Sequence, residues 1–249
     1  MLHRFLLLVL LTLATPPALA DALKVGVSPD YPPLAFQQDG RIMGIEADNV
    51  RAVSEVIGRQ MKLVPMPFDK LLPALLAGQI DVIMSGFSVT EERARQVSFS
   101  DPYMRMGQMA IMHKDKVARF AQPWSVYREG VRIGVEPGTT GAAFAEKELK
   151  DAEIAYYSDA AAAFEGLRKD QIDLYIHDAP TSWLLATTSE NSDLISLYSP
   201  LTDEMLAWAV RKDDDALLAE LNRALGLMKQ NGSLRYILNR WIPVTVEVR

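Results

Sequence analysis

The feature that most constrains this chain is a five-element pattern of strands and helices that occurs twice. The first copy has a strand at 23–27, an amphipathic helix at 46–60, a strand at 62–66, a helix at 68–77 and a strand at 80–84. The second copy has the same order at 131–135, 140–150, 153–157, 159–169 and 172–176. Alternating strands and helices are typical of mostly parallel sheets flanked by helices, so the sequence predicts an α/β fold.

The two copies also share a local sequence pattern. FDKLLPALLAGQIDVIM at 68–84 and SDAAAAFEGLRKDQIDLYI at 158–176 both run from an Asp-started helix into a strand with an Ile-Asp pair. Two similar lobes are the economical explanation of this echo. A single doubly wound sheet is the alternative, because repeats of this order also build such domains.

Further elements follow the second copy, with a strand-like run at 205–211 and helices at 214–230 and 233–241. If these helices pack on the first lobe, the chain crosses between lobes twice and the crossings form a hinge. We therefore predict a first lobe from residues 21–108 plus 203–249 and a second lobe from 109–202. A cleft between lobes joined in this way is a natural place to enclose a small ligand.

The first twenty residues have the pattern of a secretory signal peptide. His3 and Arg4 precede an apolar run from Phe5 to Leu13, and Ala-Leu-Ala at 18–20 supplies the small-x-small cleavage pattern. A retained membrane anchor is the alternative, but this run is well short of the roughly 20 residues that span a bilayer. The sequence predicts a mature chain that begins at Asp21 and is exported to the periplasm.

Composition excludes several classes of function. The formal net charge is −6, which does not suit nucleic acid, because nucleic-acid binding needs clustered Lys and Arg. The chain has no cysteine, so its lobes have no disulfides. His3, His113 and His177 are far apart in sequence, and we expect no metal and no other cofactor. No nucleophile with a partnered base is apparent.

Five blocks of sequence resemble the family-3 extracellular solute-binding proteins, the polar amino-acid receptors of ABC importers. These blocks are VGVSPDYPPLAF at 25–36, GIEADNV at 44–50, FDKLLPALLAGQIDVIMSGFSVTEERARQVSFSDPY at 68–103, IGVEPGTTGAAF at 133–144 and IDLYIHDAP at 172–180. The resemblance implies a two-lobed type II periplasmic-binding-protein fold with the ligand at the hinge. It also implies delivery of the ligand to a membrane permease, and we expect a monomer.

In this family the arginine of a T-x-x-R block grips the ligand α-carboxylate, and Arg93 in Thr-Glu-Glu-Arg at 90–93 matches that position. The chemistry is reasonable because a guanidinium offers two parallel donors to a carboxylate and stays charged when it is desolvated. The alternative is a surface ion pair with Glu91 or Glu92, which is the commoner fate of arginine on an acidic helix start.

Two loops at strand ends complete the expected carboxylate site. Thr139 and Thr140 precede a helix, whose N-terminal N–H groups lack helical partners and attract anions. Helix capping is the alternative role for either threonine, and both roles can coexist. Ser88 and the main chain of Gly86 lie after a strand, where open sheets place their ligands.

The ligand ammonium needs an acceptor, and Asp178 matches the family position that supplies it. Its alternative role is to cap the helix that Pro180 starts. Tyr31 and Phe68 match the aromatic walls of the family cleft, which cover the ligand and can face its ammonium. As bare sequence features, both aromatics are more often core residues.

One departure from the family pattern bears on the ligand. Receptors for basic amino acids often carry an acid at the end of the first strand, and this chain has Ser28 there. Asp30 is near, but it points elsewhere if the strand alternation continues. The sequence therefore favours a polar or neutral amino acid over lysine or arginine.

Two other functions fit the same blocks. Cyclohexadienyl dehydratases look similar, but their acid is a glutamate in a D-A-x-E sequence, where this chain has Thr181, which cannot act as a general acid at neutral pH. The sequence therefore favours a binding protein over an enzyme. A sensory module that docks on a membrane receptor is the third possibility, and the sequence does not separate it from import.

Overall fold

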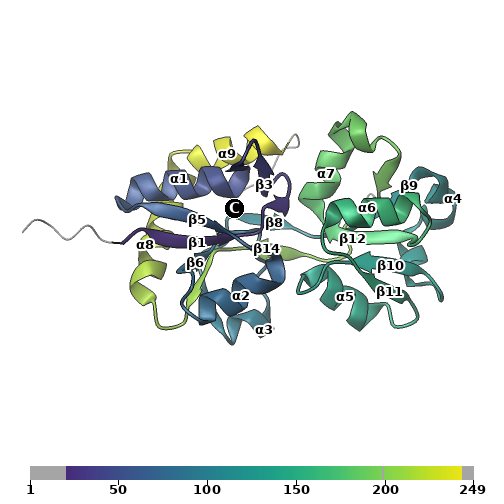
Figure 1. Ribbon diagram of the computed structural model, residues 1–249, viewed down its shortest axis with the longest axis horizontal. Helices are drawn as coiled ribbons and strands as arrows, with labels where there is room; N and C mark the ends of the chain where they lie inside the picture. The colour runs from purple at the N-terminus through teal and green to yellow at the C-terminus, as the bar shows by residue number, and fades with distance from the viewer. Residues whose placement is uncertain (1–20, 198, 243–249) are drawn as a thin grey trace, which may run out of the picture.

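The computed structural model describes residues 21–197 and 199–242, and these fold into two lobes that each surround a five-stranded sheet (Figure 1). The predicted signal peptide at 1–20 lies outside the described residues. In lobe 1 the strand order is β5 (Met61–Pro65), β1 (Leu23–Val27), β6 (Val82–Ile83), β15 (Ala209–Arg211) and β7 (Val97–Phe99). In lobe 2 it is β11 (Glu153–Tyr156), β10 (Arg132–Val135), β12 (Leu174–Asp178), β9 (Gln108–His113) and β13 (Leu194–Ser196).

The pairing directions are also the same in the two sheets. Strand β1 is parallel to β5 and β6, as β10 is to β11 and β12. One strand in each sheet, β15 or β9, runs antiparallel to both of its neighbours. The prediction of two lobes is confirmed, and the alternative of one continuous sheet is wrong.

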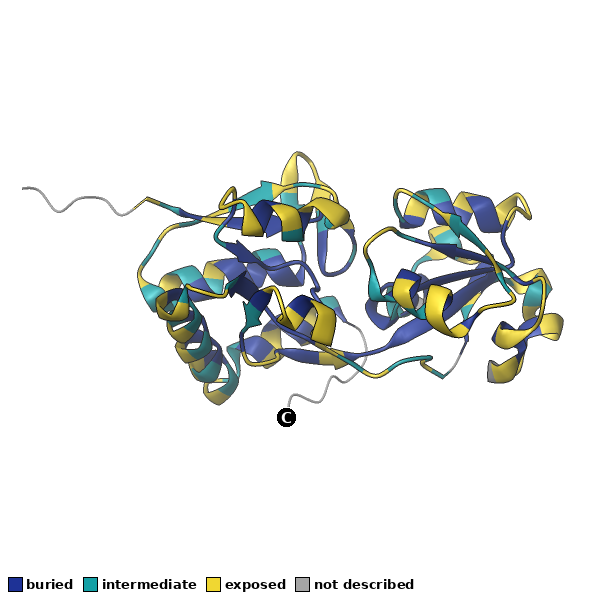
Figure 2. Cartoon of the chain, turned by 90° about the horizontal axis from the view of Figure 1, so that it is seen from below, coloured by how far each residue is buried: buried dark blue, intermediate teal, exposed yellow. Residues whose placement is uncertain are grey.

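Helices cover both faces of each sheet (Figure 1). Lobe 1 carries α1 (Ile45–Ile57), α2 (Phe68–Leu76), α3 (Glu91–Ala94), α8 (Asp215–Gln230) and α9 (Ser233–Trp241). Lobe 2 carries α4 (Val117–Phe120), α5 (Thr140–Glu148), α6 (Ala160–Arg168) and α7 (Ala179–Thr187), with 3-10 turns at Lys114–Lys116, Pro123–Tyr127 and Ser189–Asn191. The inner strands of both sheets are the most buried elements, whereas the edge strands β5 and β11 contain no buried residue (Figure 2).

Helix α1 ends three residues earlier than the sequence predicts. It buries Val50 and Val53 against the core, as the apolar spacing requires. It ends at Ile57 because Gly58 takes the left-handed conformation with φ 69°, which glycine adopts without steric cost and which closes many helices.

The echo between the two copies has a physical basis. An added Cβ on Gly26 of β1 would lie 2.3 Å from the Ile80 side chain, and one on Gly134 of β10 would lie 2.4 Å from Ile172. The isoleucine of each Ile-Asp pair therefore occupies the space that its glycine leaves open. The aspartate after it, Asp81 or Asp173, accepts a hydrogen bond from the backbone N–H of the first strand, at Lys24 in lobe 1 and at Arg132 in lobe 2. Each Ile-Asp pair thus fixes one lobe's central strands.

The chain crosses between the lobes in a two-stranded antiparallel ribbon. This ribbon pairs β8 (Met104–Met106) with β14 (Glu204–Leu206). The single strand predicted at 205–211 is therefore two strands, of which β14 belongs to the crossing and β15 to the lobe 1 sheet. A separate small sheet of β2 (Asp30–Tyr31), β3 (Ala35–Gln38) and β4 (Arg41–Met43) was not predicted.

Within residues 21–197 and 199–242, no helix has both the length and the apolar character needed to cross a membrane.

Candidate ligand-binding site

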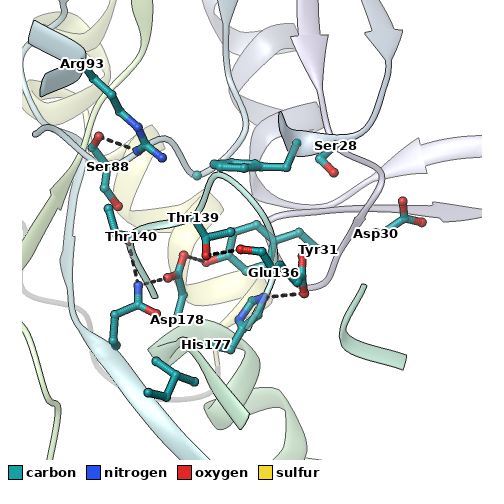
Figure 3. Close-up of a pocket in the computed structure, with 14 residues that line it drawn as sticks. Ser28, Asp30, Tyr31, Ser88, Arg93, Glu136, Thr139, Thr140, His177 and Asp178 are labelled. Atoms are coloured by element: carbon teal, nitrogen blue, oxygen red, sulfur yellow. Dashed lines mark hydrogen bonds and ion pairs between the residues drawn. The ribbon is translucent and has the colours of Figure 1, made fainter. Parts of the chain in front are cut away.

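A pocket lies between the two lobes (Figure 3). All nine residues that the sequence nominated line it, and they come from several separate segments of the chain. They are Ser28, Tyr31, Phe68, Gly86, Ser88, Arg93, Thr139, Thr140 and Asp178. Asp30, Gln108, Glu136, Ile176 and His177 also line it. The lobes therefore bring together side chains from both copies of the repeat.

Arg93 projects from the short helix α3 of lobe 1 into the pocket and is largely buried. Its guanidinium donates to the Ser88 carbonyl at 2.8 Å and, across the cleft, to the Gly138 carbonyl at 3.0 Å, and it lies 4.0 Å from the centre of the Phe87 ring. Burial lowers the pKa of Arg93 to about 10, so it keeps its charge at neutral pH. On this helix Glu91 forms an ion pair with the exposed Arg95 and not with Arg93.

The loop after β6 presents small groups beside Arg93. The Gly86 N–H donates to the buried Glu46 at 2.8 Å, so the backbone group that Gly86 has left for a ligand is its carbonyl. Glycine is required here because φ is +60° and an added Cβ would lie 2.6 Å from the Tyr31 ring. Ser28 donates its backbone N–H to the Ser85 hydroxyl at 2.8 Å.

The two threonines of lobe 2 have different roles. Thr139 is the N-cap of α5, since its hydroxyl accepts from the Ala142 N–H at 3.1 Å. Thr140 donates its hydroxyl proton to Glu204 on the hinge strand β14 at 2.7 Å. The capping alternative therefore holds for Thr139. The N–H that Thr140 presents at the start of α5 has no helical partner, which makes it the donor that a carboxylate could use.

Asp178 ends strand β12 and makes no side-chain cap bond, although it is the N-cap residue of α7. Its carboxylate accepts instead from the Tyr31 hydroxyl of lobe 1 and from the Gln108 side-chain amide of lobe 2. Burial raises the pKa of Asp178, and the nearby His177 partly opposes that rise. The tyrosine bond joins the two lobes across the pocket.

Aromatic rings form part of the lobe 1 wall. Phe68 begins α2 and packs at 5.9 Å from the Phe87 ring. The Tyr31 ring meets His177 edge-on at 5.0 Å, so the aromatic wall continues from lobe 1 to lobe 2.

Several lining residues were missed by the sequence analysis or misjudged in it. Asp30 does line the pocket, because it begins β2 after a turn and the alternation of β1 does not continue through it. Gln108 lies in a stretch without a motif, and no sequence signal marks it. Glu136 and His177 follow or end strands of the second copy, and that position relative to the sheet is a signal that could have found them. Three carboxylates therefore line the pocket, and Ser28 alone does not decide the charge of the ligand.

Thr181, which stands where the dehydratases carry their acid, lies on α7. It is buried and its hydroxyl is 3.3 Å from the Pro32 carbonyl of lobe 1. The side chain at this position therefore joins the lobes and carries no acid. Within the described part of the chain, no three His, Cys, Asp or Glu side chains are grouped so as to hold a metal ion.

Two similar lobes, a hinge of two crossings and a charged pocket between them define a two-lobed solute-binding protein of the type II periplasmic class. Residues 23–244 match the model of the bacterial extracellular solute-binding proteins, family 3, and the chain belongs to this family.

Known proteins of two kinds are similar to it. ABC transporter arginine-binding protein 1 of Escherichia coli strain K12 is 31% identical over 90% of this chain and 92% of that protein. Cyclohexadienyl dehydratase of Pseudomonas aeruginosa is 28% identical over 90% of this chain and 83% of the enzyme. A solved ancestral amino-acid-binding protein, described as a precursor of cyclohexadienyl dehydratase, superposes with a TM-score of 0.82 at 31% identity, covering 89% of this chain and 95% of its own.

Proposed function

We propose that this protein captures an amino acid, or a close zwitterionic relative, and delivers it to the membrane permease of an ABC importer. The observation that carries the proposal is that a buried guanidinium from lobe 1 and a half-buried carboxylate from lobe 2 line one pocket. A free amino acid has the two complementary charges. The Escherichia coli relative is itself named an arginine-binding protein of an ABC transporter.

In this proposal Arg93 holds the ligand carboxylate, and the Thr140 N–H at the start of α5 adds a donor. Asp178 takes the ligand ammonium. Tyr31 and Phe68 cover the carbon stem, while Ser28, Gly86, Ser88 and Thr139 shape the pocket around it. The lobe 1 and lobe 2 groups are opposite poles of one zwitterion clamp.

Ligand binding then favours closure of lobe 1 on lobe 2 about the β8 and β14 ribbon. Because Gln108 begins β9 of the lobe 2 sheet, we place the first lobe boundary between residues 107 and 108, one residue earlier than the sequence predicts. We further propose that residues 1–20 are removed as a signal peptide and that the mature protein works in the periplasm as a monomer. Import is preferred to sensing because the named Escherichia coli relative belongs to a transporter.

We also infer that the protein binds its ligand without transforming it, because the Thr181 hydroxyl is too weak an acid to act as a general acid at neutral pH. An assay for dehydration of a cyclohexadienyl acid tests this inference directly. The proposal expects no product above the uncatalysed rate. Turnover that disappears in Glu136→Gln, which removes another acid of the pocket, would show that the protein is an enzyme.

Titration calorimetry with a panel of amino acids, sugars and organic acids tests the main proposal. We expect saturable binding of at least one L-amino acid and none of its decarboxylated or deaminated analogues. Small-angle scattering at saturation should show a smaller radius of gyration than the free protein. Tight binding of a neutral sugar, with no amino acid bound, would refute the proposal.

A further inference from the structure

The charges that line the pocket do not balance for a simple zwitterion. Its carboxylates are Asp30, Glu136 and Asp178, and its guanidinium is Arg93. In the clamp described above, Arg93 and Asp178 are matched by the two charges of the amino-acid backbone. Glu136 and Asp30 are then left without a matching charge from the ligand backbone.

Glu136 is the more buried of the two unmatched acids. Its side chain is 16% exposed, and it follows directly after strand β10. One of its oxygens, Oε1, accepts from the Tyr175 hydroxyl and lies 3.5 Å from Nε2 of His177. Among the described residues, no Lys or Arg side chain forms an ion pair with Glu136. Burial raises the pKa of Glu136, although the nearby His177 and the hydrogen bond from Tyr175 partly oppose that rise.

His177 gives a second and independent sign that this end of the pocket is incomplete. It lines the pocket, is 8% exposed, and its Nδ1 has no hydrogen-bond partner among the described residues. When Nε2 carries the proton toward Glu136, Nδ1 is an acceptor. Buried polar atoms are rarely left unpaired, because an unpaired one costs free energy. Glu136 and His177 together therefore present acceptors and no free donor.

The repeat explains why the acid lies here. With Gly26 aligned to Gly134, the residue after the first strand is Ser28 in lobe 1 and Glu136 in lobe 2. Position 28 is where the sequence analysis expected an acid for a basic ligand. The structure has an acid at the equivalent position of the other lobe, and both positions line the same pocket.

We propose that Glu136 selects amino acids whose side chain ends in a cationic nitrogen group, an ammonium or a guanidinium. The proposal rests on the zwitterion clamp, and it replaces the expectation of a neutral ligand that followed from Ser28. Glu136 contacts the side-chain nitrogen, and His177 beside it offers a further acceptor. A ligand cation beside Glu136 also offsets the cost of burying its carboxylate.

The test compares ligands that differ only in this charge. Calorimetry of the wild-type protein with L-arginine against L-citrulline, and with L-lysine against L-norleucine, measures the preference without any mutation. We expect a preference of at least about 10-fold for the cationic member of one pair. Equal affinity for both members of both pairs would overturn the proposal.

The variant Glu136→Gln then assigns the preference to this residue. In this variant the ratio of affinities for the charged and the neutral ligand should fall below about 3-fold, while the affinity for the neutral ligand changes little. Glu153→Gln, which removes an exposed acid from β11 of the same lobe, is the matched control and should keep the preference. A Glu136→Gln protein that keeps it would also overturn the proposal.

The outcomes separate this inference from the proposed function. If neutral amino acids bind, and bind through Arg93, but charge on the side chain has no effect, only the role of Glu136 falls. If no amino acid binds the wild-type protein at all, the clamp and this inference fall together.

Discussion

Lobe 1 and lobe 2 place equivalent residues around the pocket, and these residues differ in charge. With Asp81 aligned to Asp173, Gly86 of lobe 1 corresponds to Asp178 of lobe 2. The small neutral residue leaves room beside Arg93, whereas the acid faces the pocket from the opposite side. The common frame of strands thus fixes where side chains point, and a few positions at the strand ends decide the chemistry.

The two lobes also differ in the burial and the ion pairs of Asp81 and Asp173, the aspartates of their Ile-Asp pairs. Asp81 is 29% exposed on its side chain and lies 3.7 Å from Arg211. Asp173 is 1% exposed on its side chain and contacts Arg132, Lys116 and Arg119. The same structural position is therefore a surface contact in one lobe and a buried charge network in the other.

The largest effect is expected from removing the acidic pole of lobe 2. Asp178→Asn leaves the ligand ammonium facing a neutral amide, and a buried charge without its partner commonly costs about 2–5 kcal/mol of binding free energy. The fold should survive, because Asp178 makes no cap bond to α7. Calorimetry with the identified ligand measures the loss. Asp203→Asn, at an exposed acid paired with Arg105, should bind as the wild-type protein does.

A result in which both variants bind equally well would mean that Asp178 is a structural residue of the Tyr31 and Gln108 network.

The next effect concerns stability and distinguishes Asp173 of lobe 2 from Asp81 of lobe 1. Burial alone raises the pKa of Asp173, but hydrogen bonds from Arg132 and Lys116 outweigh it and hold the pKa well below its usual range. Asp173→Asn breaks this buried network and should lower the free energy of unfolding by roughly 3 kcal/mol at neutral pH. Asp81→Asn in lobe 1 should cost clearly less. Denaturant unfolding measures both.

The pH dependence of this effect follows from the sign of the shift. Because the folded pKa of Asp173 lies below the unfolded value of about 3.9, its stabilisation is fully present above that pH and is lost as pH falls through the folded pKa. Asp173→Asn should therefore be less sensitive to acid than the wild-type protein below about pH 4. Parallel acid transitions in the two proteins would contradict this account of Asp173.

The smallest of the three effects concerns the cationic pole of lobe 1. Arg93→Lys keeps the charge but loses the two-pronged donor geometry, so affinity should fall by at least about 10-fold, or 1.4 kcal/mol. The variant should also lose most of its preference for the ligand over its decarboxylated analogue. Arg95→Lys, two residues away on the exposed side, is the control. Unchanged affinity in both would return Arg93 to a role as a pocket-wall residue.

The sequence predicted most strands and helices of the two lobes, because the signals for these elements are local. The strand at 23–27, the stop at Gly78 and the Ile-Asp echo each depend on neighbours a few residues away. The small sheet β2–β4 was missed because its strands have two to four residues, too few to show a period. The strand predicted at 80–84 is paired only at Val82–Ile83, because pairing depends on distant partners in β1 and β15.

For the pocket, the family resemblance nominated residues that the fold does bring together, but it could not show how each is already bonded. The Gly86 N–H is taken by Glu46, and the Thr140 hydroxyl donates to Glu204. Glu46 and Glu204 are far from their partners in the chain, so no local pattern links them. Glu136 was missed for a different reason, since the family pattern places an acid at position 28 of lobe 1 and Glu136 is at the equivalent position of lobe 2.

Strand β15 lies between β6 and β7 in the lobe 1 sheet, although it comes late in the chain. All strands of the lobe 2 sheet, by contrast, lie between Gln108 and Ser196. Because a chain is synthesised from its N-terminus onward, lobe 2 can be complete while β6 still has an unpaired edge. Such an edge can pair with a wrong strand. The first lobe in sequence is the last to be finished, and the newly made protein has no working pocket until its final fifth has emerged.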